Sequence, residues 1–260
     1  MKILILTQEE NLYLPRSFAT VCQGRKSDIC CIVSAPAMST HGGPVKGFIK
    51  HLNLFGLIDT MRITFRVLHA KIMAKLISPK PDGPFYSIAN VARAFDVPFY
   101  SVEKVKGEEL QNIITKYQPE LLISISCPQI IGKKVRERFA KGCINVHGAP
   151  LPKYRGLMPA FWELKNNETR TAATVHDLDS KLDNGAILLQ QEVEITRADT
   201  WNSLVRKTKA AGAQALLEVI AQIEKGTVER KPNLDEEATY FSFPTATDRR
   251  EFIAAGRRFF

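Results

Sequence analysis

The sequence predicts an α/β fold with a mainly parallel central sheet and helices on both of its faces. Short apolar runs rich in branched residues recur along the chain, which is typical of strands buried in a parallel sheet. Amphipathic stretches with helical spacing lie between these runs, as in strand–helix–strand units. The composition, 45% hydrophobic and 24% charged over 260 residues, is that of a globular protein with a sizeable core.

Four apolar runs in the first 150 residues are predicted to be strands of this sheet. The stretch "GEELQNIITKYQ" (107–118) is predicted to form a helix before the third run, and "QIIGKKVRERFA" (129–140) a helix after it. In parallel sheets of this kind, ligands bind at the carboxyl ends of the strands. The four runs are "KILIL" (2–6), "ICCIV" (29–33), "ELLISIS" (120–126) and "CINV" (143–146).

The second half of the chain continues with two strands and a long helix. The strands are expected in "AATVHDL" (172–178) and "GAILLQQEVEI" (185–195). The second of these alternates apolar and polar residues at its end, as a strand with one wetter face does. A helix is predicted from Thr200, a suitable N-cap, to Lys225, with Gly226 as its stop.

The chain is expected to form one main domain, residues 1–226, with a C-terminal tail, residues 227–260, packed on it. Within the tail, "TYFSFPT" (239–245) is expected to be an edge strand or an extended segment. The stretch "DRREFIAAGRRF" (248–259) is expected to form a final helix. No internal repeat or low-complexity segment interrupts this arrangement.

Residues 44–80 form a basic helical insertion in the main domain. Apolar residues recur there at spacings of three and four, which predicts one apolar stripe along a helix. Basic residues interrupt the stripe, so no uncharged stretch approaches the ~20 residues that span a bilayer. Two interpretations stay open: the helix packs against the domain, or it rests as a basic amphipathic helix on an anionic membrane surface. The apolar positions are Leu54, Ile58, Met61, Phe65, Leu68, Ile72 and Leu76, and the basic ones are Arg62, Arg66, Lys71 and Lys75.

The formal net charge of +9 favours acidic partners such as phosphates, nucleic acid or an anionic membrane, without choosing among them. The five cysteines are odd in number and include no C-x-x-C pair, which indicates buried, reduced thiols in a cytoplasmic protein. The opening "MKILILTQEE" has too short an apolar stretch for a signal peptide and is expected to begin with a strand.

Asn145 and His147 stand two residues apart at the end of a predicted strand, so they share one of its faces. Pro150 and Pro152 follow, and the strand must stop there because proline cannot donate to a central ladder. An unpaired amide and imidazole are costly in a core, but at an open strand end they can face a substrate. The amide can donate to an oxyanion, and the imidazole can donate or exchange a proton. A hydrogen-bonded structural pair is the alternative.

The surroundings of this pair carry a family resemblance. "INVHGAPLPKYRGLMPAFWEL" (144–164) is followed by "TVHDLDSKLDNGAILL" (174–189), with Asp183 lying 36 residues after His147. The pattern resembles the folate-dependent formyltransferases, whose signature is an N-x-H strand leading into L-P-x-x-x-G, then an aspartate in an L-D-x-G loop. The resemblance covers residues 90–195 and implies a Rossmann-like formyltransferase fold, with residues 1–226 as the catalytic domain.

The resemblance implies that Asn145, His147 and Asp183 form the catalytic trio. Formyl transfer from 10-formyltetrahydrofolate to an amine develops an oxyanion, which Asn145 and His147 are placed to stabilise. Asp183 is expected to manage the proton that the amine loses, directly or through water. Gly185 is expected to let the backbone approach the ligand closely. The family chemistry involves formyltetrahydrofolate as co-substrate and no metal.

Further site residues follow from the same resemblance. Residues 124–131 correspond to the family loop whose backbone holds the pterin ring, with one more contact from the aspartate loop. A second group is expected to line the substrate pocket, although a structural role is the alternative for its histidine and its arginine. The folate contacts are Cys127, Gln129, Ile130 and Leu182, and the substrate-pocket residues are Arg155, Thr174 and His176.

The sequence gives less information about the identity of the formyl acceptor than about the reaction. "LTQEENLYLP" (6–15) has two acidic residues and no glycine where the purine enzyme of the family has a glycine-rich phosphate turn, which disfavours that substrate. Residues 227–260 are too few for the β-barrel with which methionyl-tRNA formyltransferases grip tRNA, so an atypical branch is expected. An amino sugar, linked to a nucleotide or a lipid, is the leading acceptor. Methionyl-tRNA, and a formylfolate hydrolase or sensor with no separate acceptor, are the alternatives.

The expected partners are a small anionic amine acceptor and, on the membrane interpretation of residues 44–80, the inner face of the cytoplasmic membrane. Nucleic acid is disfavoured because the basic clusters lack interleaved aromatic residues. A homodimer is compatible with the sequence, which does not fix the oligomeric state.

Overall fold

The computed structural model describes residues 1–36 and 43–260 of the chain and contains a seven-stranded sheet. The strands of this sheet are β1 (Ile3–Thr7), β2 (Ile29–Ser34), β3 (Phe99–Ser101), β4 (Leu121–Ile125), β5 (Cys143–His147), β7 (Arg170–Asp177) and β8 (Ile187–Glu194). Their order is β3-β2-β1-β4-β5-β7-β8. The first five are parallel, and β7 and β8 are antiparallel to their neighbours. The predicted α/β class with a mostly parallel sheet is therefore confirmed.

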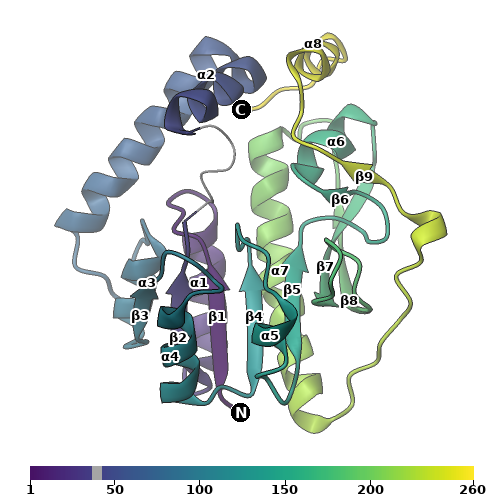
Figure 1. Ribbon diagram of the computed structural model, residues 1–260. Helices are drawn as coiled ribbons and strands as arrows, with labels where there is room; N and C mark the ends of the chain where they lie inside the picture. The colour runs from purple at the N-terminus through teal and green to yellow at the C-terminus, as the bar shows by residue number, and fades with distance from the viewer. Residues whose placement is uncertain (37–42) are drawn as a thin grey trace.

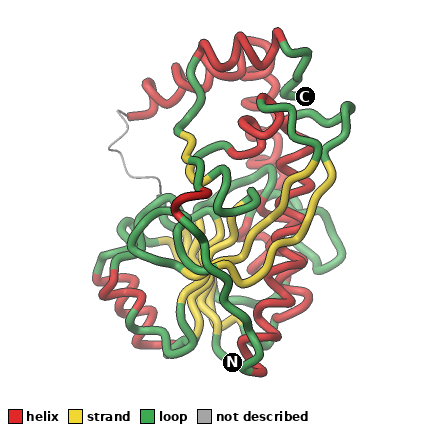
Figure 2. The backbone as a smooth tube through the Cα atoms, turned by 90° about the vertical axis from the view of Figure 1, so that its right-hand side faces the viewer, coloured by secondary structure: helices red, strands yellow, loops and turns green. Residues whose placement is uncertain are grey.

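Helices cover both faces of the sheet, as Figure 1 and Figure 2 show. Side chains of α1, α3 and α7 join one buried cluster, and side chains of α4 and α5 join another on the opposite face. The bounds are α1 (Leu14–Arg25), α3 (Ile88–Ala94), α4 (Glu108–Tyr117), α5 (Lys133–Arg136) and α7 (Trp201–Lys225).

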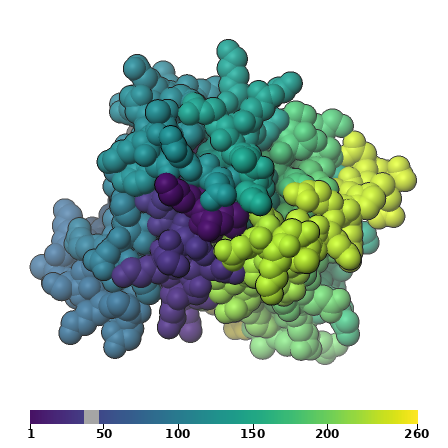
Figure 3. Space-filling view, turned by 90° about the horizontal axis from the view of Figure 1, so that it is seen from below, coloured from purple at the N-terminus to yellow at the C-terminus, as the bar shows by residue number. Residues whose placement is uncertain are grey.

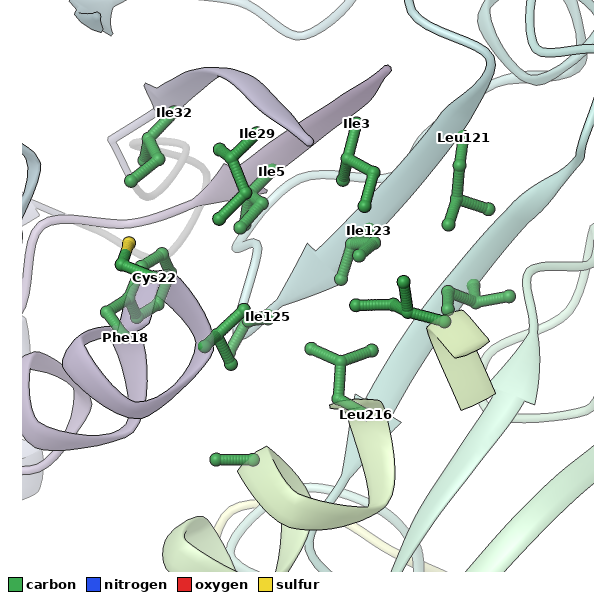
Figure 4. Close-up of a cluster of buried hydrophobic side chains, with 14 of the residues drawn as sticks. Ile3, Ile5, Phe18, Cys22, Ile29, Ile32, Leu121, Ile123, Ile125 and Leu216 are labelled. Atoms are coloured by element: carbon green, nitrogen blue, oxygen red, sulfur yellow. The ribbon is translucent and has the colours of Figure 1, made fainter. Parts of the chain in front are cut away.

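The alternation of side chains along β1 divides the core into these two layers. Ile3 and Ile5 point into the cluster formed with α1 and α7, which Figure 4 shows together with Phe18 of α1. Leu4 and Leu6 point to the other face, into the cluster that contains residues of α4 and α5. Because successive side chains of a strand alternate, a strand that is apolar at every position must be covered on both faces.

The long helix α7 has the ends that the sequence predicts. Thr200 accepts a hydrogen bond from the backbone N–H of Ser203, and the Ser203 hydroxyl accepts one from the N–H of Thr200, which closes a capping box. Gly226 ends the helix in the left-handed conformation at φ 70°.

The helix predicted over residues 129–140 is much shorter in the structure, where α5 has only four residues. The side chain of Gln129 is bonded to the backbone of three other loop residues, at Pro36, Glu103 and Val105. These bonds hold the beginning of the segment in a loop. The prediction of a full helix was wrong here because amphipathic spacing does not register such long-range side-chain bonds.

The last part of the chain packs back on the main domain. Its elements are a 3₁₀ turn (Asp235–Glu237), β9 (Tyr240–Phe241) and α8 (Ala246–Ala254). They lie near two elements of the main domain, β6 (Arg155–Gly156) and α6 (Pro159–Lys165). β9 pairs with β6, and Lys231 forms an isolated bridge with Ile187 of β8. Phe252 and Phe259 are fully buried in a third cluster. Figure 3, a view from the end opposite to α8, shows the segment after α7 close to the first residues of the chain.

Helix α2 (Gly43–Leu76) lies over the end of the molecule at which the parallel strands point, as Figure 1 shows. A non-helical conformation at Gly56 (φ 73°, ψ 176°) divides it into two segments. Of the predicted apolar stripe, Leu54 is buried, whereas the six residues from Ile58 to Leu76 are exposed. The helix therefore packs against the domain, as one of the two interpretations has it, through Leu54, Thr60 and Ala70, whereas the predicted stripe from Ile58 onward faces away from it. No helix in the part of the chain that the structure describes is long and apolar enough to cross a membrane.

Candidate active site

Strand β5 places the predicted amide and imidazole at its carboxyl end, next to β7. The antiparallel register between the two strands sets Asn145 opposite His176 and His147 opposite Thr174. Asn145 is half-buried, whereas His147 and His176 are buried. The pairing thus brings a second histidine, from a different strand, to the side chain of Asn145.

His176 fixes the orientation of Asn145 through a hydrogen bond. Nδ1 of His176 lies 2.8 Å from the carbonyl oxygen of Asp177, which can only accept, so Nδ1 carries the hydrogen. Nε2 then has a lone pair and accepts from Nδ2 of Asn145 at 3.1 Å. Burial lowers the pKa of His176 to about 4, despite the opposing effect of the Asp183 carboxylate, so the ring stays neutral and keeps this role. The second hydrogen of the Asn145 amide is left to donate to another group.

His147 and Asp183 face one another in the site. Nε2 of His147 lies 2.9 Å from the carbonyl oxygen of Tyr154, so this nitrogen donates. Nδ1 is therefore the free position of the ring, and it lies 3.6 Å from Oδ2 of Asp183. The two side chains are close enough to exchange a proton directly or through one water.

Asp183 is held firmly in its loop although it lies in the left-handed region, at φ 51°. Its Oδ2 accepts a hydrogen bond from the N–H of Gly156 at 3.0 Å. The side-chain amide of Asn233 donates to the carbonyl oxygens of both Asp183 and Gly185, at 3.0 and 2.9 Å. Three hydrogen bonds from two distant segments therefore hold this carboxylate and the backbone of its loop in place.

Gly185 packs closely against the backbone of Asp177. A Cβ atom at position 185 would lie 1.9 Å from the carbonyl oxygen of Asp177, so any larger residue would push the loop off β7. Packing of the loop on the strand therefore explains this glycine, whereas the sequence analysis connected it with an approach to a ligand.

Two of the residues expected in the substrate pocket are bonded within the protein. The guanidinium group of Arg155 is buried and donates to Asp235 at 2.7 Å and to the side chain of Asn233 at 2.7 Å. The hydroxyl group of Thr174 donates to the carbonyl oxygen of Ala149 at 2.6 Å and is fully buried. Both side chains fix loops at the rim of the site, which is the structural alternative that the sequence left open for Arg155.

The residues expected near the folate differ in how freely they could bind a ligand. Gln129 uses its side chain for the loop contacts described above, and Cys127 is half-buried with its thiol 3.4 Å from the carbonyl oxygen of Gln129. Ile130 and Leu182 are 75% and 55% exposed, so these two apolar side chains are available to cover a flat ring. Among the described residues, no cluster of His, Cys, Asp and Glu could hold a metal ion.

Several residues that organise this site gave no signal in the sequence. Tyr154 contributes only its backbone carbonyl, and a backbone group has no side-chain pattern. Asn233 lies 50 residues after Asp183 in the tail, and only the fold brings the two together. Contacts of this kind depend on tertiary structure, so spacing along the chain could not reveal them.

The carboxylate of Glu10 accepts hydrogen bonds from the backbone N–H groups at the start of α1. Its Oε1 accepts from the N–H of Leu12 at 2.7 Å, and its Oε2 accepts from those of Tyr13 and Leu14 at 2.7 and 2.8 Å. Such amides at a helix N-terminus are the donors that a phosphate would use. In this protein an internal carboxylate takes them, which supports the expectation that no acceptor phosphate binds there.

Replacing Glu10 with alanine is expected to lower the free energy of unfolding by about 1 kcal/mol, as loss of a helix cap does. Added inorganic phosphate should then stabilise the Glu10→Ala variant more than the wild type, because three amides become available. Denaturant unfolding with and without phosphate measures this, with Gln8→Ala as the control. Equal stabilisation of all three proteins by phosphate would contradict the assignment.

Comparison with known proteins identifies the family. The formyl transferase family model matches residues 57–220, which is more than half of the chain. The chain belongs to the formyl transferase family. The chain is 36% identical over 169 residues to a methionyl-tRNA formyltransferase of Thermodesulfovibrio yellowstonii, in an alignment that covers 62% of the chain and 55% of that protein. The chain spans about half the length of the curated relatives it matches.

Solved structures show the same fold. The chain matches phosphoribosylglycinamide formyltransferase of Anaplasma phagocytophilum with a TM-score of 0.60 at 14% identity, covering 93% of this chain and 98% of that one. It matches an N-formyltransferase of Helicobacter canadensis, solved with folinic acid and dTDP-3-aminofucose, with a TM-score of 0.57 at 19% identity, covering 93% and 71%. The predicted family and its Rossmann-like fold are both confirmed.

Proposed function

We propose that this protein transfers a formyl group from 10-formyltetrahydrofolate to a primary amine. The observation that carries the proposal is the meeting of Asn145, His147 and Asp183 at the carboxyl end of β5. Formyltetrahydrofolate, when bound, supplies an activated formyl carbon. The residues present fit that group, because Ile130 and Leu182 offer exposed apolar surface and the Asn145 amide has a free hydrogen.

Each residue of the trio has a role that follows from its contacts. The free N–H of Asn145 donates to the formyl oxygen as negative charge develops there during attack by the amine. Nδ1 of His147 is the ring position that can donate to the same oxygen when it carries a hydrogen, because Nε2 is bonded to Tyr154. As the bond between the amine nitrogen and the formyl carbon forms, Asp183 accepts the proton that the amine loses. That proton can then pass to the departing nitrogen of the donor.

We infer that the acceptor is an amino sugar carrying an anionic group. A cavity of about 380 Å³ is lined by residues of α2, of the loop after β1, of the segment before α3 and of α7. Asn11, Arg66, His69 and Arg206 give it polar and basic groups that suit a negatively charged part of an acceptor, and Phe65 and Phe85 are among its apolar residues. The Helicobacter canadensis structure, solved with a nucleotide-linked amino sugar, is one of the similar folds.

Methionyl-tRNA is the second candidate acceptor, because the similar curated relatives are methionyl-tRNA formyltransferases. The two candidates are separated by incubation of the full chain with 10-formyltetrahydrofolate and either nucleotide-linked amino sugars or methionyl-tRNA. Mass spectrometry should detect one added formyl group on a sugar and none on methionyl-tRNA. Formylation of methionyl-tRNA with no sugar modified would overturn the ranking, and formate release without any product would favour a hydrolase.

A further inference from the structure

One face of α2 carries large apolar side chains that no other described part of the chain covers. We name this face the outer stripe. Its members recur every three or four residues over five helical turns and are each between 45% and 75% exposed. Exposed apolar surface that is continuous over such a length is unusual in a monomeric protein and indicates a binding surface. The outer stripe consists of Leu57, Ile58, Met61, Phe65, Leu68, Ile72 and Leu76.

The helix is fixed to the protein by its opposite face, so the outer stripe cannot simply rotate inward. Thr60 and Ala70 are buried, and Ile63 packs against the third buried cluster. The carbonyl oxygen of Ala74 accepts a hydrogen bond from the side chain of Asn90 in α3. At 100° per residue these positions lie on the side of the helix away from the stripe.

Basic residues border the outer stripe on both sides. By the helical repeat, Lys71 and Lys75 lie along one border, and Arg62 and Arg66 lie along the other. Asp59 is the single acidic residue between positions 57 and 76, and it is paired with Arg62 at 2.9 Å. An apolar strip between two rows of positive charge is complementary to a partner whose interior is apolar and whose surface carries negative groups.

We propose that α2 rests on an anionic lipid bilayer, with the outer stripe among the acyl chains and its basic borders at the headgroups. A basic amphipathic helix lying in the plane of the interface has this distribution of side chains. A second copy of the chain fits less well, because two outer stripes placed together would bring Lys71 and Lys75 of both copies to the same contact, whereas Arg62 and Arg66 are held by Asp59, Asn202 and the ring of Phe260. Charge complementarity therefore selects the bilayer.

The proposed docking would bring the candidate active site to the membrane surface. α2 lies at the carboxyl ends of the parallel strands, where β5 carries Asn145 and His147 (Figure 1). Phe65 belongs to the outer stripe and also lines the cavity with Arg66 and Arg206. An anionic amine carried on a lipid could enter this cavity from the bilayer, a consequence that rests on the proposed function, whereas the docking itself does not.

Vesicle co-sedimentation tests the docking without any substrate. The full chain is mixed with vesicles of phosphatidylcholine alone, or with vesicles containing an equal part of phosphatidylglycerol. Binding is expected only to the anionic vesicles. The double variant Phe65→Gln/Leu68→Gln is expected to bind at least about 10-fold less tightly, since two large apolar groups leave the lipid. Lys71→Gln/Lys75→Gln should bind less tightly and respond less to salt.

Ile253→Gln in α8 is the matched control, because Ile253 is also 45% exposed but lies outside the outer stripe. It should bind as the wild type does, and circular dichroism should show that all variants are folded. The proposal fails if the wild type binds neither vesicle, or binds both equally. It also fails if light scattering shows a dimer that Phe65→Gln/Leu68→Gln separates, since the outer stripe would then be a contact between copies.

Discussion

Replacing Asp183 with asparagine is expected to slow formyl transfer by about 10²–10⁴-fold, the usual contribution of a positioned proton-transfer group. Asparagine has nearly the same shape but cannot accept the proton that the amine loses. The fold should tolerate the change, because asparagine adopts the left-handed conformation readily and its side-chain oxygen can still accept from the N–H of Gly156. Turnover should therefore fall while the binding of a formylfolate, followed by calorimetry, stays close to that of the wild type.

Asp179 provides the matched control for this experiment. It is an exposed aspartate on the entry side of the same loop, and its carboxylate accepts from the N–H of Ser180 at 2.6 Å. Asp179→Asn makes the same chemical change outside the trio and should keep most of the activity. If Asp183→Asn turned over as fast as Asp179→Asn, the role of Asp183 in proton transfer would be wrong.

Glu163 is expected to make the protein less stable as the pH rises. Its side chain in α6 is fully buried, and burial raises the pKa of Glu163 to about 8, although a hydrogen bond from Thr171 opposes this. Between the unfolded pKa, near 4.5, and about 8, the folded protein holds a proton that the unfolded chain has lost. This contribution is complete below pH 4.5 and disappears as the pH rises through 8.

The expected change in the free energy of unfolding is on the order of 4 kcal/mol for a pKa difference of this size. Glu163→Gln keeps the shape of the protonated side chain and cannot ionise, so it should remove most of the loss between pH 6 and 9. Denaturant unfolding across this range measures the slope, with the exposed Glu236→Gln as the control. A wild-type slope that Glu163→Gln leaves unchanged would contradict the prediction.

His176 is expected to change the free energy of unfolding in the opposite direction, making the protein less stable as the pH falls. Because burial lowers its pKa to about 4, the unfolded chain binds a proton between pH 6.5 and 4 that the folded protein does not. Stability from this group is lost as the pH falls through that window. The two windows overlap between pH 4.5 and 6.5, where the two groups change the free energy of unfolding in opposite directions, so the effect of Glu163→Gln is clearest above pH 6.5.

The sequence was sufficient for the parts of the fold that depend on local pattern. Wholly apolar runs predicted β1, β2, β4 and β5, and cap residues predicted both ends of α7. The trio could be predicted because strand periodicity sets Asn145 and His147 on one face and the motif supplies Asp183. These features depend on residues close together in the sequence, so they can be predicted without knowledge of the tertiary structure.

Other features depend on what each segment meets in space. The spacing of Ile58, Phe65 and Ile72 correctly indicates an apolar stripe, but spacing alone does not say whether a stripe faces the protein or the solvent. The sequence predicts a helix in the loop after β4 because the side-chain bonds of Gln129 depend on the tertiary structure. The role of Asn233 depends on the path of the whole tail.

The most direct test of the proposed activity follows the formyl carbon itself. The full chain is incubated with 10-formyltetrahydrofolate labelled in that carbon and with an amino-sugar acceptor, and the label is traced by nuclear magnetic resonance. We predict that the label appears as an N-formyl group on the acceptor, and that Asn145→Ala nearly abolishes this product. Label found only in free formate, or product formed equally fast by Asn145→Ala, would contradict the account.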